Sequence, residues 1–198
     1  MTKLRILLWV VAALAGMGFL GLYAWKTSFQ DDARQSALAA IRPDYTLTAH
    51  TGETVTERNY LGKWQLVFFG FTHCPDICPT TLAEVATVMD GLGEAARNVQ
   101  PLFISIDPER DRPAAMAEYV AAFHPALIGL TGEPEAVAEA AQSFYAYYEM
   151  QPQSDAPDGY TMSHSSALYL LDPNGRFVHL FSYGTPAAEI VEDLKEKL

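Results

Sequence analysis

The strongest constraint on the fold is a continuous apolar run at Gln65–Phe71 (QLVFFGF), which is rich in residues that favour β-strands. A strand that is apolar on both faces is typical of a strand buried inside a sheet that is covered on both sides. The run leads into a loop that holds Cys74, and apolar residues at helical spacing predict a helix from about Pro79 to Ala96. The chain is therefore expected to bury this strand and to present a cysteine at its end.

The same alternation of strands and helices continues to the C-terminus. Apolar runs predict further strands, and prolines suited to first helical positions predict the helices. The strands are expected at Leu102–Ile106, Ala126–Leu130, Ala167–Leu171 and Phe177–Phe181, and the helices at Pro113–Phe123, Pro134–Tyr145 and from Pro186 onward. The order β-α-β-α-β-α-β-β-α predicts an α/β fold with a central mixed sheet flanked by helices. A strand, a cysteine loop and a helix, with a closing β-β-α unit, form the layout of the thioredoxin-like fold.

The N-terminal region contains a long uncharged segment, residues 6–25 (ILLWVVAALAGMGFLGLYAW). Twenty apolar residues are enough for a helix to cross about 30 Å of hydrocarbon. Lys3 and Arg5 precede the segment and favour a cytoplasmic N-terminus, and no clear cleavage site of a signal peptide follows it. We expect a transmembrane anchor at residues 1–26, a linker at 27–43 and one domain at 44–198, outside the cytoplasm.

The charge of the chain argues against nucleic acid as a partner. The net charge is −11, and the part beyond residue 26 holds 10 basic and 24 acidic residues, a balance of 10 − 24 = −14. An acidic domain repels phosphate backbones but is compatible with a cationic metal or with a basic patch on a partner. Solubility is the ordinary explanation for most of these charges.

The only two cysteines, Cys74 and Cys78, lie close together at the expected start of a helix. Unpaired N–H groups and the partial positive charge of a helix N-terminus stabilise a thiolate there. Redox pairs of the thioredoxin class usually have two intervening residues, whereas this pair has three. The wider spacing suits two bonds to one metal at least as well as a disulfide, so a redox pair and a metal pair both remain open.

A third ligand would separate these uses, and His164 is the best placed of the five histidines. It immediately precedes the strand expected at Ala167–Leu171, and in a thioredoxin-like layout that position lies opposite the cysteine loop. Oxidoreductases of this fold have a cis-proline at that position, whereas this chain has no proline there and has a histidine instead. His73 adjoins Cys74, but neighbouring residues point in opposite directions, which favours an electrostatic or structural role. Two thiolates with one imidazole suit Cu(I) or zinc.

Three stretches of the sequence resemble the Sco/SenC family of copper proteins. They are Gly70-Phe71-Thr72-His73-Cys74-Pro75-Asp76-Ile77-Cys78-Pro79, Ser105-Ile106-Asp107-Pro108-Glu109-Arg110-Asp111, and Tyr160–Ser166 before Tyr169-Leu170-Leu171-Asp172-Pro173-Asn174-Gly175. The resemblance spans about residues 43–198 in the same order and includes the N-terminal anchor.

The resemblance implies a thioredoxin-like domain that binds copper, as Cu(I) and also as Cu(II), through Cys74, Cys78 and His164. It implies a metallochaperone that supports assembly of the dinuclear copper centre of cytochrome c oxidase subunit II. It also implies a single-pass protein of the inner (cytoplasmic) membrane with its domain in the periplasm. A periplasmic copper chaperone and a thiol reductant are further expected partners.

Alternatives stay open at this stage. Reduction of the cysteines of that copper centre would make the chain a thiol–disulfide oxidoreductase, and some relatives are proposed to be redox or copper sensors. A membrane-anchored peroxidase is disfavoured because no Thr-x-x-Cys arrangement surrounds Cys74. Many family members have an acid before the ligand histidine, where this chain has Ser163, so a partner that orients the imidazole is missing or replaced. Four acids, Asp76, Asp107, Glu109 and Asp111, are candidates either for a docking surround or for helix caps and solvated charges.

Overall fold

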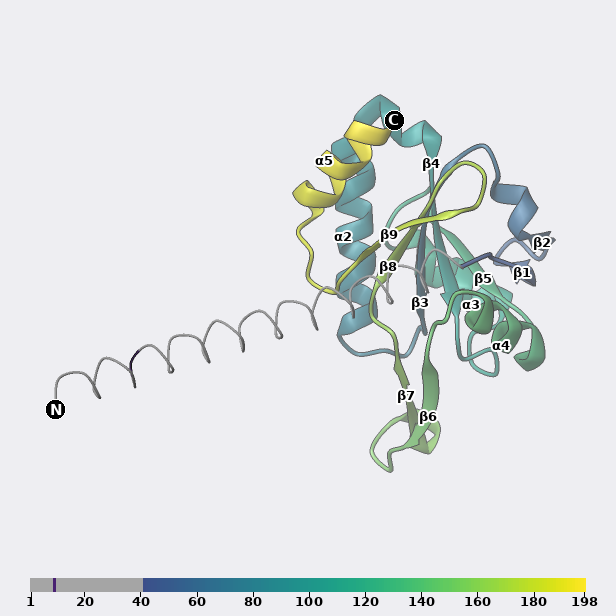
Figure 1. Cartoon of the computed structure of the whole chain (residues 1–198). Coiled ribbons are helices and arrows are strands. Elements are labelled where there is room, and N and C mark those ends of the chain that lie inside the picture. The colour runs from purple at the N-terminus through teal and green to yellow at the C-terminus, as the bar shows by residue number, and fades with distance from the viewer. Residues whose placement is uncertain (1–8, 10–40) are drawn as a thin grey trace, which may run out of the picture. The chain divides into compact units, whose positions relative to one another are not determined.

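A seven-stranded mixed sheet forms the centre of the protein in the computed structural model, which describes residue 9 and residues 41–198 (Figure 1). Its strand order is β2-β1-β5-β4-β3-β8-β9. The strands are β1 (Thr46–Ala49), β2 (Thr54–Thr56), β3 (Trp64–Gly70), β4 (Val99–Ser105), β5 (Ile128–Thr131), β8 (Leu168–Leu171) and β9 (Phe177–Phe181). Strands β3, β4 and β5 are parallel neighbours, and the other pairs are antiparallel. The expected thioredoxin-like fold with a mixed sheet is confirmed.

The two central strands explain where the site lies. Strands β3 and β4 pair in register from Trp64 and Val99 to Gly70 and Ser105, and almost every residue of both is buried. Their near-continuous apolar sequences fit this double-sided burial. Because parallel strands point the same way, their carboxyl ends meet at one edge of the sheet. The cysteine loop and the loop after β4 both begin at that edge.

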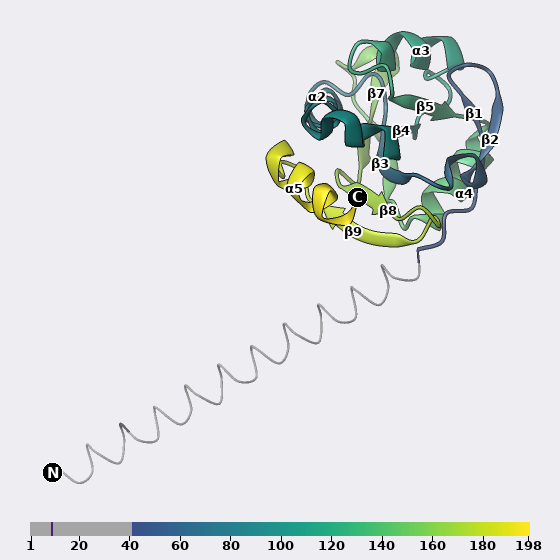
Figure 2. The same ribbon diagram turned by 90° about the horizontal axis from the view of Figure 1, so that it is seen from above.

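Helices cover both faces of the sheet, as expected (Figure 2). They are α2 (Ile77–Leu92), α3 (Pro113–Ala121), α4 (Pro134–Ser143) and α5 (Ala187–Lys197), with short 3-10 helices at Glu57–Tyr60, Gly93–Asn98 and Pro157–Gly159. Helices α2 and α5 lie side by side (Figure 1). Phe68 and Phe103 stack on the face that α3 covers, where Tyr119 contacts Phe103. Phe69 points to the opposite face and contacts Phe144 at the end of α4.

One element was not expected from the sequence. Strands β6 (Tyr148–Pro152) and β7 (Tyr160–His164) form a separate antiparallel hairpin that projects from the sheet edge (Figure 1). Its strands are short, mostly half-buried or exposed, and contain Pro152 at an end. They therefore lack the apolar periodicity that marks the other strands.

The predicted transmembrane anchor at residues 6–25 lies outside the described residues. In residues 41–198, no helix combines the length and the apolar character needed to cross a membrane. The compact unit of the domain begins at Ile41, whose side chain is fully buried, and Tyr45 is buried with it.

Candidate metal centre

Three side chains from separate elements converge at the carboxyl edge of β3. Cys74 comes from the loop after β3, Cys78 from the first turn of α2, and His164 from the last residue of β7. Their ligand atoms all lie within 4.8 Å of one another, and Cys78 Sγ is 3.5 Å from His164 Nε2. Cys78 is fully buried, whereas Cys74 and His164 are half-buried, so the group is open on one side. No disulfide joins Cys74 and Cys78 in the structure.

The start of α2 explains how the two sulfurs meet. The backbone N–H of Cys78, one of the unpaired donors of the first helical turn, donates to Cys74 Sγ at 3.4 Å. The N–H of Cys74 in turn donates to the carbonyl oxygen of Phe71 at 3.2 Å, which closes the loop. The three intervening residues thus let the chain turn once and bring both sulfurs to one point.

The two thiols differ in acidity. A hydrogen bond from the Cys78 side chain lowers the pKa of Cys74 to about 4, against the effect of burial. The same hydrogen bond, together with burial, raises the pKa of Cys78. The resting site therefore holds one thiolate, Cys74, and one protonated thiol, Cys78.

His164 is oriented by its neighbours. Its Nδ1 lies 2.9 Å from the backbone oxygen of Ser165, and because a carbonyl oxygen only accepts, Nδ1 carries the proton. In the neutral ring, Nε2 then directs its lone pair toward the sulfurs. The edges of Phe68 and Phe71 hold the ring from two sides. The carbonyl of Ser165 thus takes the orienting role that Ser163, which is exposed, cannot fill.

The absence of a side chain at Gly70 makes room for the site. A Cβ there would lie 2.6 Å from Cys78 Sγ and 2.9 Å from Phe103 Cε2, both closer than van der Waals contact allows. Gly70 is the last residue of β3, so the strand can pass directly beneath the buried sulfur.

We expect Gly70→Ala to destabilise the fold by about 1–3 kcal/mol and to weaken metal binding, because the added methyl group displaces Cys78. Gly129→Ala is the matched control, since its Cβ would press on Met116 and Val120 of α3 instead. Urea unfolding and competitive Cu(I) titration of the full chain would measure both effects. Equal Cu(I) affinity in Gly70→Ala and wild type would contradict this role of Gly70.

A buried carboxylate fixes the cysteine loop to the loop after β4. Asp111 is fully buried and accepts from the N–H and hydroxyl of Thr72, at 3.0 and 2.5 Å, and from the Ser105 hydroxyl at 2.7 Å. Burial raises the pKa of Asp111, against the effect of these donors. His73 Nδ1 lies 4.0 Å from Asp111 and 3.0 Å from the Thr72 hydroxyl. His73 is exposed and outside the Cys–Cys–His group, which fits the structural role expected for it.

A second buried acid fixes the hairpin that carries His164. Asp107 accepts from Arg110 Nε at 2.5 Å and from the Tyr160 hydroxyl at 2.9 Å. The Arg110 guanidinium stacks 3.9 Å over the Tyr160 ring. Asp107 and Asp111 therefore hold loops together inside the domain and do not form an exposed acidic surface for a partner. Asp76 and Glu109 are exposed. Asp107 and Asp111 both belong to the motif Ser105–Asp111, and the sequence did not indicate these buried contacts.

The other three histidines have structural surroundings. His50 Nδ1 accepts from the N–H of Gly129 at 3.1 Å and joins the end of β1 to β5. His124 Nδ1 accepts from the N–H of Ala126 at 3.1 Å, a local contact two residues along the chain. His179 is exposed and contacts the Phe181 ring.

Comparisons with known proteins agree with this geometry. The sequence profile described as SCO1/SenC matches residues 33–198. The chain is 41% identical over 199 residues to the Mus musculus protein SCO2 homolog, mitochondrial, which covers 96% of this chain and 77% of that protein. The copper-bound ScoI of Bradyrhizobium japonicum superposes with a TM-score of 0.74 at 43% identity, over 80% of this chain and 100% of that one. The copper-bound ScoI of Arabidopsis thaliana superposes with a TM-score of 0.75 at 40% identity, over 80% of this chain and 98% of that one.

Proposed function

The chain belongs to the SCO1/SenC family, and we propose that it is a copper metallochaperone that binds copper through Cys74, Cys78 and His164. The observation that carries this proposal is the convergence of their ligand atoms within 4.8 Å. The two solved relatives with copper bound support the choice of metal. Sco proteins are described as cytochrome c oxidase assembly proteins, so the acceptor we propose is the dinuclear copper centre of subunit II.

The donor set suits Cu(I). Two thiolates and one imidazole are soft or intermediate ligands, and Cu(I) accepts three of them. Cys74 is already a thiolate and His164 presents a free lone pair, so only Cys78 must lose a proton when the ion binds. Cu(II) would be held by the same residues with an added oxygen donor.

The same geometry suits release of the metal. Cys74 and His164 are half-buried at the open side of the group, whereas Cys78 lies behind them. A partner's ligands can therefore replace Cys74 and His164 first, while the buried sulfur keeps the ion until the end. We propose that a periplasmic copper chaperone loads the site and that a thiol reductant keeps the pair reduced.

A second function is favoured by the unequal thiols. The Cys74 thiolate can attack a disulfide of subunit II, forming a mixed disulfide and releasing one cysteine sulfur of the acceptor. Cys78, after losing its proton, then attacks Cys74 Sγ, which releases the acceptor's second sulfur and leaves a Cys74–Cys78 disulfide. Two electrons pass to the acceptor, whose cysteines are then able to bind copper.

The location we propose follows from the sequence. Residues 1–26 would anchor the chain in the inner (cytoplasmic) membrane, and residues 27–43 would link the anchor to the copper domain at 44–198 in the periplasm. Extraction of membranes with alkaline carbonate would leave the full chain in the pellet, and protease would reach the domain only from the periplasmic side.

Transfer to subunit II tests the function directly. Copper-loaded full chain in detergent micelles would be mixed with copper-free subunit II whose centre cysteines are either reduced or joined in a disulfide. A copper chaperone fills the reduced acceptor, so copper is found in subunit II after the two proteins are separated. A thiol–disulfide oxidoreductase instead reduces the disulfide of the oxidised acceptor, and this reaction is tested with copper-free chain whose cysteines are reduced. Failure of both reactions would refute the two functions together.

A further inference from the structure

The methionines of the domain fall into two groups with different surroundings. Met89 and Met116 are fully packed in the core, with 2% and 0% of their surfaces exposed. Met150 and Met162 lie on the hairpin β6–β7, where Met150 is 51% exposed and Met162 half-buried. Exposed methionine on a hairpin is unexplained by core packing, and the two residues are direct partners across the strands.

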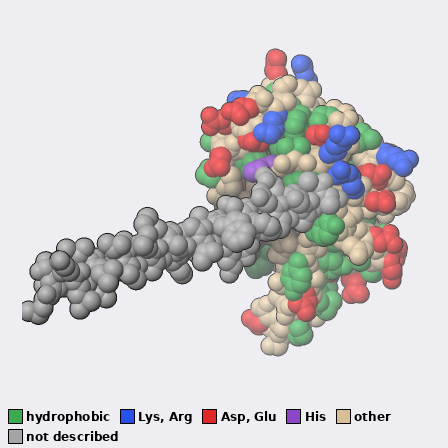
Figure 3. Space-filling model, in the orientation of Figure 1, with side chains coloured by type: hydrophobic (Ala, Val, Ile, Leu, Met, Phe, Trp, Pro, Cys, Tyr) green, Lys and Arg blue, Asp and Glu red, His purple; other side chains and the backbone are tan. Residues whose placement is uncertain are grey.

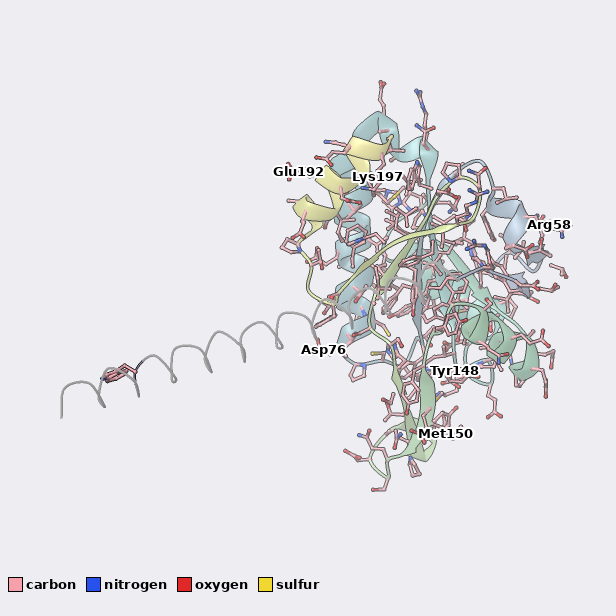
Figure 4. The ribbon with its side chains drawn as sticks, in the orientation of Figure 1. Arg58, Asp76, Tyr148, Met150, Glu192 and Lys197 are labelled. Carbon is pink, nitrogen blue, oxygen red and sulfur yellow. The ribbon has the colours of Figure 1, made fainter. Side chains whose placement is uncertain are left out.

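The hairpin register aligns this pair with the candidate metal ligand. Met150 pairs with Met162, and Tyr148 pairs with His164 two residues closer to the sheet. Because side chains alternate along a strand, Met162 and His164 lie on the same face of β7, about 7 Å apart along the backbone. Figure 4 shows Tyr148 nearer the sheet and Met150 nearer the end of the hairpin.

This face of the hairpin lines an open groove of about 180 Å³. Met150 and Met162 form one wall together with Tyr148, and the loop after β4, with Asp107 and Glu109, forms the opposite wall. The two methionine side chains therefore line an open groove instead of packing in the core. Tyr148 of the groove wall pairs with His164 across the hairpin, whereas Cys74 and Cys78 do not line the groove.

Two acids line the groove: Asp107, which is paired with Arg110, and Glu109, which is exposed. Residues 113–175 contain no Lys or Arg, but they contain eight acidic residues. Figure 3 shows the blue Lys and Arg side chains away from the hairpin on the face in view, while the hairpin is mostly tan with some green and a few red side chains. A negative surface raises the local concentration of metal cations, and thioethers select soft Cu(I) or Ag(I) among them.

We propose that Met150 and Met162 form an auxiliary Cu(I) site that holds the ion beside the Cys74–Cys78–His164 group during loading or release. This rests on the proposed copper function. Neutral thioethers bind Cu(I) more weakly than thiolates do, so the ion passes on to the deeper site. They also carry no proton to lose and cannot form a disulfide, so the auxiliary site stays available when the cysteines are oxidised.

The binding test uses the full chain in micelles with Cys74→Ser, Cys78→Ser and His164→Ala, labelled with ¹³C at the methionine methyl groups. Titration with Ag(I), a stable substitute for Cu(I), should shift the Met150 and Met162 signals together, up to one ion per chain. Met89 and Met116 are internal controls and should not move. Adding Met150→Leu should abolish the Met162 shift, because the two sulfurs share the ion. Unmoved Met150 and Met162 signals, or a Met162 shift that survives Met150→Leu, would overturn the proposal.

The role of the auxiliary site in copper loading, here called the transit role, has its own test in the chain with intact cysteines. The variant Met150→Leu/Met162→Leu keeps apolar side chains of similar volume and removes only the sulfurs. It should take up Cu(I) from a chelated donor several-fold more slowly than wild type, with the same final affinity. Equal uptake rates would overturn the transit role. Absence of Cu(I) binding in the wild-type Cys–Cys–His group would refute the proposed function instead, and the methyl shifts distinguish the two failures.

Discussion

Copper binding at pH 7.5 is expected to release about one proton per Cu(I), and the apparent affinity for Cu(I) should rise about tenfold per pH unit between about pH 7 and 8.5. Cys74, with a pKa of about 4, has already lost its proton in this range. Cys78, with a raised pKa, keeps its proton until the metal displaces it. Because the bound form carries one proton fewer than the free form, raising the pH favours binding.

Proton release can be followed with a pH indicator in weakly buffered, anaerobic solution, and affinity by competition with a Cu(I) chelator. Two ordinary thiols with pKa values near 9 would release nearly two protons per Cu(I) at pH 7.5 and give a slope close to one hundredfold per unit. That result would contradict the unequal pair.

Replacement of His164 by alanine is expected to weaken Cu(I) binding by at least about 100-fold, or about 2.7 kcal/mol. Loss of a residue that merely orients a metal ligand commonly costs 10–100-fold in affinity, and His164 is proposed to be a ligand itself. Its Nε2 lies 3.5 Å from Cys78 Sγ, and Nδ1 is held by Ser165. Chelator competition with the full chain gives the affinity ratio.

Two other histidines serve as controls for this variant. His73→Ala removes an exposed ring next to Cys74 and should lower the affinity only slightly, through the loop that Asp111 holds. His179→Ala removes an exposed ring from β9 and should leave the affinity unchanged. A loss in His73→Ala as large as that in His164→Ala would show that the ligand assignment is wrong.

Much of the fold could be predicted because its strands carry strong local signals. The apolar runs that became β3, β4 and β8 lie in the centre of the sheet, where burial on both faces removes polar residues from the sequence. Prolines at the starts of α3 and α4 also fixed those helix starts correctly. The helix carrying Cys78 began two residues earlier than expected, at Ile77.

The hairpin β6–β7 could not be predicted for a physical reason. Its strands project from the domain and pair only with each other, so they need no alternating apolar pattern. Contacts of Tyr160 with Asp107 and Arg110 hold it in place, and Tyr160 lies 53 residues after Asp107 in the sequence. Pattern analysis has no access to such contacts.

The candidate site also has one part that the sequence predicted and one part that it did not. The sequence singled out Cys74, Cys78 and His164, and the structure brings their ligand atoms together. It did not single out Gly70, whose missing side chain admits Cys78, or the carbonyl of Ser165, which orients His164. A backbone oxygen leaves no trace in residue type, and a required glycine resembles any other glycine until its neighbours are known. The family assignment from three motifs is confirmed by the profile match over residues 33–198.

X-ray absorption of the copper-loaded chain tests the central claim most directly. Full chain, reduced anaerobically and loaded with one equivalent of Cu(I), should show two sulfur ligands and one nitrogen ligand around copper. The nitrogen should disappear in His164→Ala and remain in His73→Ala. A wild-type copper bound by sulfur alone, or a nitrogen ligand that survives in His164→Ala, would contradict a site built from Cys74, Cys78 and His164.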